Sequence, residues 1–170
     1  WYYFAGGLGF LTIAALGGNM FFSHVQNRVL AWKDPLSVID KEGYQVCQSL
    51  FAIGTGGWFG LGLNQGLPNK IPVVEKDFVF SAISEEMGGI FAICIIMVCI
   101  SCFLMIFNVS MQMKDDFYRL IALGLGSIYA LQVFLTIGGV TKFIPSTGVT
   151  LPLVSYGGSS LLSTMIIFGV

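Results

Sequence analysis

Long runs of uncharged, apolar residues constrain this chain more than any other feature. Trp1 to Ser23, Met87 to Ser110 and Leu120 to Thr141 contain no acidic or basic side chain. A helix rises about 1.5 Å per residue and the hydrocarbon core is about 30 Å thick, so each run is long enough to cross a bilayer. Charged residues make up 10% of the chain, whereas soluble domains carry about 25%. We therefore expect an all-α, polytopic membrane helix bundle.

A fourth uncharged run, Phe143 to Val170, contains two prolines and a glycine pair in its first half. Proline breaks a helix interior, so we expect regular helix only from about Ser159. The chain is then one membrane domain, with spans at 1–23, 83–110 and 119–140, the start of a further span at 159–170, and loops at 24–82, 111–118 and 141–158. Because Trp1 opens the chain inside an apolar run, we expect this domain to be part of a longer membrane protein.

The charged residues indicate an orientation but no nucleic-acid partner. Eight basic and nine acidic side chains give a net charge of −1, without a basic tract for nucleic acid. Basic residues near short loops favour the cytoplasmic side, and Lys114 and Arg119 flank such a loop, partly offset by Asp115 and Asp116. The long loop 24–82, which is rich in aromatic residues, would then lie outside.

Neither the cysteines nor the glycines form a cofactor motif. Cys94, Cys99 and Cys102 lie in a predicted span. Cys99 and Cys102 have CxxC spacing, but the chain has no second such pair and no histidine near them, so we expect packing rather than metal binding. The glycine-rich segment 54–66 lacks the spacing of a dinucleotide fingerprint, and close backbone turns near the membrane surface are the better interpretation. Just before it, residues 44–53 divide into two faces, which predicts a short interfacial helix.

A group of carboxylates borders the second span. In one interpretation Asp77 caps a helix that begins at Phe78, while Glu85 and Glu86 are solvated at the membrane boundary. In the other, Asp77 points into an outward-facing cleft, with Ser81 and Glu85 on the same helical face. Asp77 and Glu85 would lie about 12 Å apart along that helix, too far for a tight carboxylate pair. One carboxylate would therefore act alone.

Prolines, glycines and hydroxyl residues crowd the segment 143–160. Non-helical backbone at membrane depth persists only where it lines a cavity or is covered by protein, which favours a segment that folds inward. The alternative is a tight outer loop in which Ser159 and Ser160 simply begin the last helix. The composition of the segment does not separate these two arrangements.

Two segments resemble the SEDS family, the shape, elongation, division and sporulation proteins of the FtsW, RodA and SpoVE types. Segment 71–88 contains Pro72, then Asp-Phe-Val-Phe from Asp77 and Glu-Glu-Met-Gly from Glu85, similar to the family's pattern in its large outer loop. Segment 145–160, Pro-Ser-Thr-Gly-Val-Thr-Leu-Pro-Leu-Val-Ser-Tyr-Gly-Gly-Ser-Ser, is similar to the family's signature before the final helix. The order and the spacing of the two segments also agree.

The resemblance continues through the beginning of the long loop, Trp32 to Leu50, and so covers nearly the whole chain beyond Arg28. It implies about ten membrane helices in the bacterial cytoplasmic membrane, of which this chain holds roughly the last four. It also implies a peptidoglycan glycosyltransferase that polymerises lipid II during division, elongation or sporulation. The implied partners are lipid II, membrane lipids and a class B penicillin-binding protein, the transpeptidase that crosslinks the strands.

By the resemblance, Asp77 is the catalytic base that removes the proton of an acceptor sugar hydroxyl while a polyprenyl pyrophosphate leaves. The adjoining helix N-terminus favours the ionised carboxylate and would make it a weaker base. Candidates for substrate binding are Lys76, Glu85, Lys142, Thr147, Ser155, Ser159 and Ser160. A divalent cation, Mg²⁺ or Mn²⁺, is a further candidate for neutralising the pyrophosphate, and we expect neither a protein metal site nor an organic cofactor.

Two other functions stay open on the sequence. A lipid II flippase predicts ionisable residues at mid-membrane, and no charged residue interrupts the long apolar runs of this chain. A scaffold would only recruit the penicillin-binding protein through small residues such as Gly124, Gly126 and Ser127. The scaffold hypothesis predicts that Asp77 is dispensable.

Overall fold

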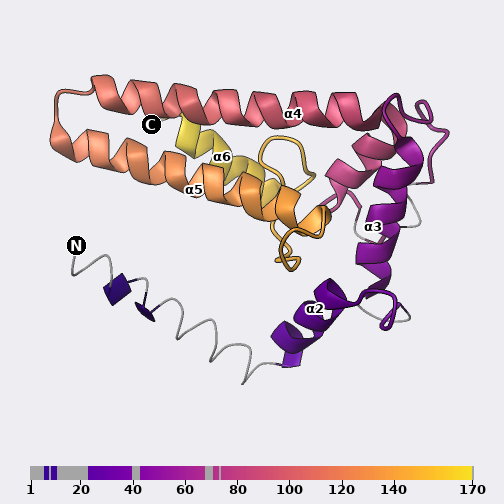
Figure 1. Cartoon of the computed structure of the whole chain (residues 1–170). Helices are drawn as coiled ribbons and strands as arrows, with labels where there is room; N and C mark the ends of the chain where they lie inside the picture. Colours follow the sequence, from indigo (N-terminus) through magenta and orange to yellow (C-terminus); the bar gives the residue numbers. More distant parts are fainter. Residues whose placement is uncertain are drawn as a thin grey trace.

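The computed structural model describes residues 6–7, 9–10, 23–39, 43–67, 71–72 and 74–169. Within these residues the helices are α2 (Ser23–Lys33), α3 (Gly43–Gly56), α4 (Val79–Gln112), α5 (Asp116–Val140) and α6 (Gly158–Gly169). Figure 1 shows α4 and α5 running alongside each other, with α3 at one end of α4. The all-α class predicted from the apolar runs is confirmed. Most of the predicted span 1–23 lies outside the described residues.

Helices α4 and α5 are each long and apolar enough to cross a membrane, and they pack as an antiparallel pair (Figure 1). Their contact uses a small residue and a large one. Gly126 lets the side chain of Ile106 approach closely, and Tyr129 is only 2% exposed. Elsewhere on α4, apolar side chains such as Met97 and Met105 remain exposed. These outer surfaces suit a lipid environment or contact with further helices.

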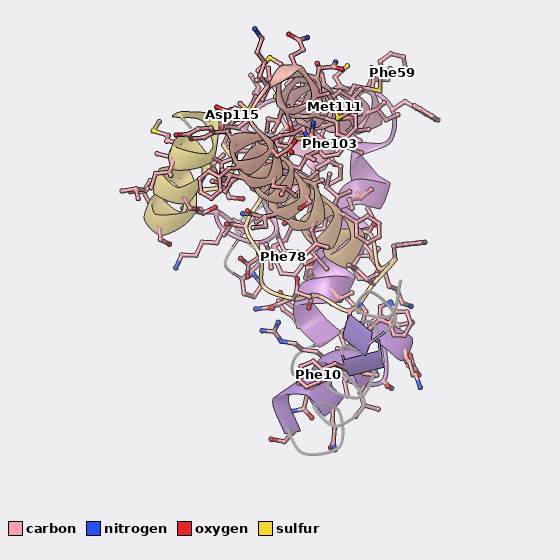
Figure 2. All side chains as sticks on the ribbon, turned by 90° about the vertical axis from the view of Figure 1, so that its left-hand side faces the viewer. Phe10, Phe59, Phe78, Phe103, Met111 and Asp115 are labelled. Carbon is pink, nitrogen blue, oxygen red and sulfur yellow. The ribbon has the colours of Figure 1, made fainter. Side chains whose placement is uncertain are left out.

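Helix α4 is interrupted at Gly88, whose φ of +87° and ψ of 170° leave the helical region. Glycine adopts such a positive φ without the steric cost that a Cβ would bring. At the break, the N–H of Leu61 donates to the carbonyl of Glu85 at 2.9 Å. The N–H of Gly62 donates to the carbonyl of Glu86 at 3.0 Å. The glycine-rich segment thus replaces helical hydrogen bonds that the break removes. Figure 2 shows Phe59, from the same segment, at the edge of the molecule.

Helix α3 holds the beginning of α4 against the end of α5. The buried hydroxyl of Ser49 donates to the carbonyl of Val140 at 3.1 Å and lies 2.6 Å from the hydroxyl of Ser81. Because the single proton of Ser49 goes to Val140, Ser81 is the donor between the two hydroxyls. The helix predicted at 44–53 corresponds to α3, which extends to Gly56. Three helices therefore meet at one buried polar contact.

The segment between α5 and α6 folds back onto α5. The hydroxyl of Thr136 donates to the carbonyl of Val149 at 2.9 Å, and the amide of Gln132 donates to the carbonyl of Thr150 at 3.0 Å. Leu151 is 1% exposed and anchors the segment in the core. Of the two arrangements that the sequence allowed, the structure contains the inward-folded one.

Candidate functional site

A cavity of about 230 Å³ lies where α2, α3 and the end of α5 meet the turn before α4 and the segment after α5. Its polar lining residues come from all five of these parts, and they include Arg28, Gln45, Asp77, Thr136, Ser146 and Thr147. Among the described lining residues, Arg28 and Asp77 carry a charge. Figure 2 labels Phe78, a further lining residue, beside the end of α5. Residues distant in the sequence thus form one polar cavity.

Asp77 lies in the turn before α4, and its side chain lines this cavity. The helix N-cap position is occupied by Phe78, and no side chain makes a capping hydrogen bond there. Phe78 is 4% exposed, so it anchors the turn in the core while its neighbour faces the cavity. The interpretation of Asp77 as the helix cap is therefore wrong. Its carboxylate is available for contacts with a ligand.

Burial raises the pKa of the Asp77 carboxyl above its ordinary value. The positive charges of Arg28 and, to a smaller extent, Lys76 act in the opposite direction and lower this pKa. The expected weakening of the base by the helix N-terminus is therefore not the dominant effect, because desolvation outweighs the charges around it. A carboxylate with a raised pKa is a better proton acceptor near neutral pH.

Arg28 is the functional candidate that the sequence analysis missed. It lies on α2, and its Nη1 donates to the carbonyl of Ser146 at 3.0 Å, across 118 positions of sequence. Gly148, with a φ of +73°, lies beside both this guanidinium and Asp77. A Cβ built on this glycine would lie 3.5 Å from both terminal nitrogens of Arg28 and 3.6 Å from Oδ2 of Asp77. The two charged groups thus adjoin the same glycine in the lining of one cavity.

Glu85 occupies a different environment from Asp77, although both were placed on one helical face. It is only 7% exposed, so the expectation that it is solvated at the membrane boundary is wrong. Its Oε1 accepts a hydrogen bond from the N–H of Leu67 at 3.2 Å, and its Oε2 is buried without a partner among the described residues. Gly66 packs directly against the carboxylate. Glu85 therefore lies beneath the glycine-rich loop and not in the cavity.

Of the other predicted substrate-binding residues, Thr147 lines the cavity, and Lys76 is an exposed neighbour of Asp77. Three serines and one lysine lie elsewhere among the described residues. The hydroxyl of Ser155 accepts from the N–H of Leu151, the hydroxyl of Ser160 accepts from Gln132, and Ser159 is exposed at the beginning of α6. The carbonyl of Lys142 accepts from the indole N–H of Trp32, which attaches α2 to the end of α5.

The cavity combines one carboxylate, one guanidinium and several hydroxyl and carbonyl groups. The described residues include no group of three or more histidine, cysteine, aspartate or glutamate side chains arranged for a metal ion. A Mg²⁺ ion held by one or two carboxylates and the phosphate oxygens of a substrate is compatible with Asp77 alone. Chemically, this arrangement suits proton removal from a hydroxyl next to an anionic group.

Comparison with known proteins assigns these features to one family. Residues 1–170 match the model of a family described as cell cycle protein, of the FtsW, RodA and SpoVE types. The peptidoglycan glycosyltransferase RodA of Mycobacterium bovis is 40% identical over 164 residues, which cover 96% of this chain and 35% of the relative. Stage V sporulation protein E of Bacillus subtilis is 39% identical over 141 residues, which cover 82% of this chain and 37% of the relative.

The chain spans little more than a third of the length of these curated relatives. A solved structure described as showing how a peptidoglycan synthase complex coordinates polymerization and crosslinking has the same fold, with a TM-score of 0.75 and 26% identity. That likeness covers 99% of this chain and 47% of the solved chain. The sequence similarity and the fold thus lead to the same group of proteins.

Proposed function

This chain belongs to the FtsW, RodA and SpoVE family of cell cycle proteins, the SEDS family, and from that premise we propose that it forms part of a membrane glycosyltransferase that polymerises lipid II into peptidoglycan strands. The observation that carries the proposal is the carboxylate of Asp77, which lines a polar cavity together with Arg28. The names of the relatives, peptidoglycan glycosyltransferase among them, support the same activity.

In the proposed reaction, a sugar hydroxyl of the acceptor attacks the anomeric carbon of a lipid-linked donor. The carboxylate of Asp77 accepts the hydroxyl proton as the new C–O bond forms, and the bond to the polyprenyl pyrophosphate breaks with its electron pair. Pyrophosphate is a good leaving group once its charge is balanced, so a second carboxylic acid is unnecessary. Burial supports this role, because it raises the pKa of Asp77 and makes it a more effective proton acceptor.

The position of the site supports an assignment of its substrates and partners. The cavity adjoins the turn before α4 and the end of α5, where the uncharged run 120–141 ends, so a ligand with a membrane-embedded tail and a polar head is the natural occupant. We propose lipid II as that ligand, in a multi-pass protein of the bacterial cytoplasmic membrane with residues 24–82 outside. A class B penicillin-binding protein is the proposed partner, and Mg²⁺ or Mn²⁺ the proposed counter-ion for pyrophosphate.

The proposal is tested by Asp77→Asn in the intact protein, purified together with its penicillin-binding partner and supplied with lipid II. We expect glycan strands to form about 10²- to 10⁴-fold more slowly, because the amide is isosteric but accepts no proton at neutral pH. Glu75→Gln is the matched control, since Glu75 is an exposed carboxylate two positions earlier, and it should retain polymerisation. Strands of normal length from the Asp77→Asn protein would refute the assignment of the base.

A further inference from the structure

We propose that Arg28, together with the open space at Gly148, forms the subsite that holds the pyrophosphate of the lipid-linked donor beside Asp77. This assignment rests on the glycosyl transfer proposed above and adds the residue that balances the charge of the leaving group. It is carried by three observations: the cavity, the position of the guanidinium, and the glycine that adjoins both charged groups.

The guanidinium of Arg28 is exposed to the cavity and retains donor capacity. The guanidinium has five N–H donors. Among the described residues it has one acceptor, the carbonyl of Ser146, which lies 3.0 Å from Nη1. A planar guanidinium with several available donors binds phosphate groups through paired, charge-assisted hydrogen bonds. The contact with Ser146 fixes the orientation of the side chain, so the bond to a phosphate would require little reordering.

Arg28 and Asp77 do not form a direct ion pair in the structure. Each lies in ordinary van der Waals distance of the position that a Cβ of residue 148 would occupy, at 3.5 and 3.6 Å. A closed ion pair would neutralise both groups and exclude an anion from the arginine. Because Gly148 carries no side chain, the position beside both groups that a Cβ would fill stays open. The φ of +73° at this position further disfavours any residue other than glycine.

The charges of the proposed subsite match the reaction. As the glycosidic oxygen leaves, negative charge accumulates on the pyrophosphate, and the guanidinium stabilises it in a partly desolvated cavity. The proton of the acceptor hydroxyl moves to the carboxylate of Asp77, which adjoins the same glycine. Without Arg28, the anionic leaving group and the anionic base would repel each other at this short range. Arg28 therefore permits both groups to occupy one cavity.

A purely structural role for Arg28 makes a different prediction. If the arginine only ties α2 to the segment 143–150, its loss loosens the cavity and weakens every lipid-phosphate ligand to the same degree. If it binds pyrophosphate, its loss weakens a pyrophosphate more than a monophosphate. The ratio of the affinity for pyrophosphate to the affinity for monophosphate therefore distinguishes the structural role of Arg28 from the binding role.

The experiment measures binding of undecaprenyl pyrophosphate and of undecaprenyl monophosphate to the intact protein in detergent or nanodiscs. Parent, Arg28→Gln and Arg28→Lys proteins are compared, each in an Asp77→Asn background so that no turnover occurs. We expect Arg28→Gln to weaken pyrophosphate binding by about ten- to a hundredfold, the loss of a charge-assisted bond, and monophosphate binding by less. Arg28→Lys should recover part of the difference, because it keeps the charge without the paired donors.

Lys33→Gln is the matched control, since Lys33 is an exposed cation on the same helix and is not among the described lining residues. It should leave both affinities unchanged. If Arg28→Gln weakens the binding of pyrophosphate and monophosphate equally, or weakens neither, the proposed subsite is wrong. If Arg28→Gln does not fold, the ratio of the two affinities measured for Arg28→Lys decides. Polymerisation by Asp77→Asn would instead refute the base and leave the affinity ratio intact, so the two proposals fail separately.

Discussion

Asp77 and Glu85 are carboxylates eight positions apart, and the structure places them in different environments. Asp77 lines a polar cavity together with an arginine, and both side chains adjoin Gly148. Glu85 is sealed beneath the glycine-rich loop, with Leu67 as its donor and Gly66 against its carboxylate. The same chemical group is thus positioned for a ligand in one place and for holding the chain in the other. The segments that pack on each residue decide the difference.

The largest expected effect compares the two carboxylates directly, by replacing each with its amide. Asp77→Asn should lower the rate of lipid II polymerisation by about 10²- to 10⁴-fold, the usual contribution of a general base. Glu85→Gln should retain most of the rate, because its amide oxygen can still accept the hydrogen bond from Leu67. The rates are measured on purified protein of equal thermal stability. A comparable loss of rate in both variants would mean that the two environments do not differ in function.

A second effect probes the region of Glu85 through the helix break. Gly88→Ala should destabilise the protein by about 2 kcal/mol or more, because φ is positive there and the new Cβ would lie 2.5 Å from the backbone of Gly60 and Trp58. Gly124→Ala, on α5 with nothing within 4 Å of the new Cβ, is the control and should be neutral or stabilising. Thermal unfolding in detergent gives the comparison. Equal unfolding temperatures would show that the break does not need glycine.

Much of the fold follows from the sequence, whereas the contrast between the carboxylates does not. The uncharged runs predict α4 and α5 because length and hydrophobicity are local properties of the chain. Asp77 and Thr147 are marked by motifs that surround them. Arg28 carries no such mark, because its role depends on a contact with Ser146, 118 positions away. The burial of Glu85 likewise depends on a loop that closes over it, which no spacing of residues along α4 reveals.

A third effect tests the contact that lies between the two carboxylates. Ser81→Ala removes the donor to the hydroxyl of Ser49, and it should cost about 1–2 kcal/mol because a buried acceptor loses its partner. Thr55→Ala is the control, since Thr55 is exposed and its hydroxyl donates to the carbonyls of Phe51 and Ala52 in the preceding turn of α3. Unfolding by heat is measured for both variants. If Ser81→Ala is as stable as the control, the serine pair does not connect the two regions energetically.

The smallest effect concerns the titration of Asp77. Its pKa is raised by burial, and Arg28 and Lys76 lower it in part. A general base must be ionised, so kcat/KM falls as the pH falls through this raised pKa. The fall therefore occurs at a higher pH than it would for an aspartate with an ordinary pKa. The sign for stability is opposite: Asp77 favours the folded state most below its unfolded pKa, and this contribution is lost as the pH rises through the folded pKa.

Arg28→Gln removes the larger of the two charges that lower this pKa, so the acidic limb should move to higher pH. Lys76→Gln should move it in the same direction by a smaller amount, and Glu85→Gln should leave it in place, because Glu85 is sealed in a separate environment. The pH at which the acidic limb lies depends on the pKa of Asp77, whereas the maximum value of kcat/KM depends on donor binding. One pH profile of Arg28→Gln therefore measures the two effects separately. A limb that moves with Glu85→Gln would show that the two carboxylates are electrostatically coupled and that their environments are not separate.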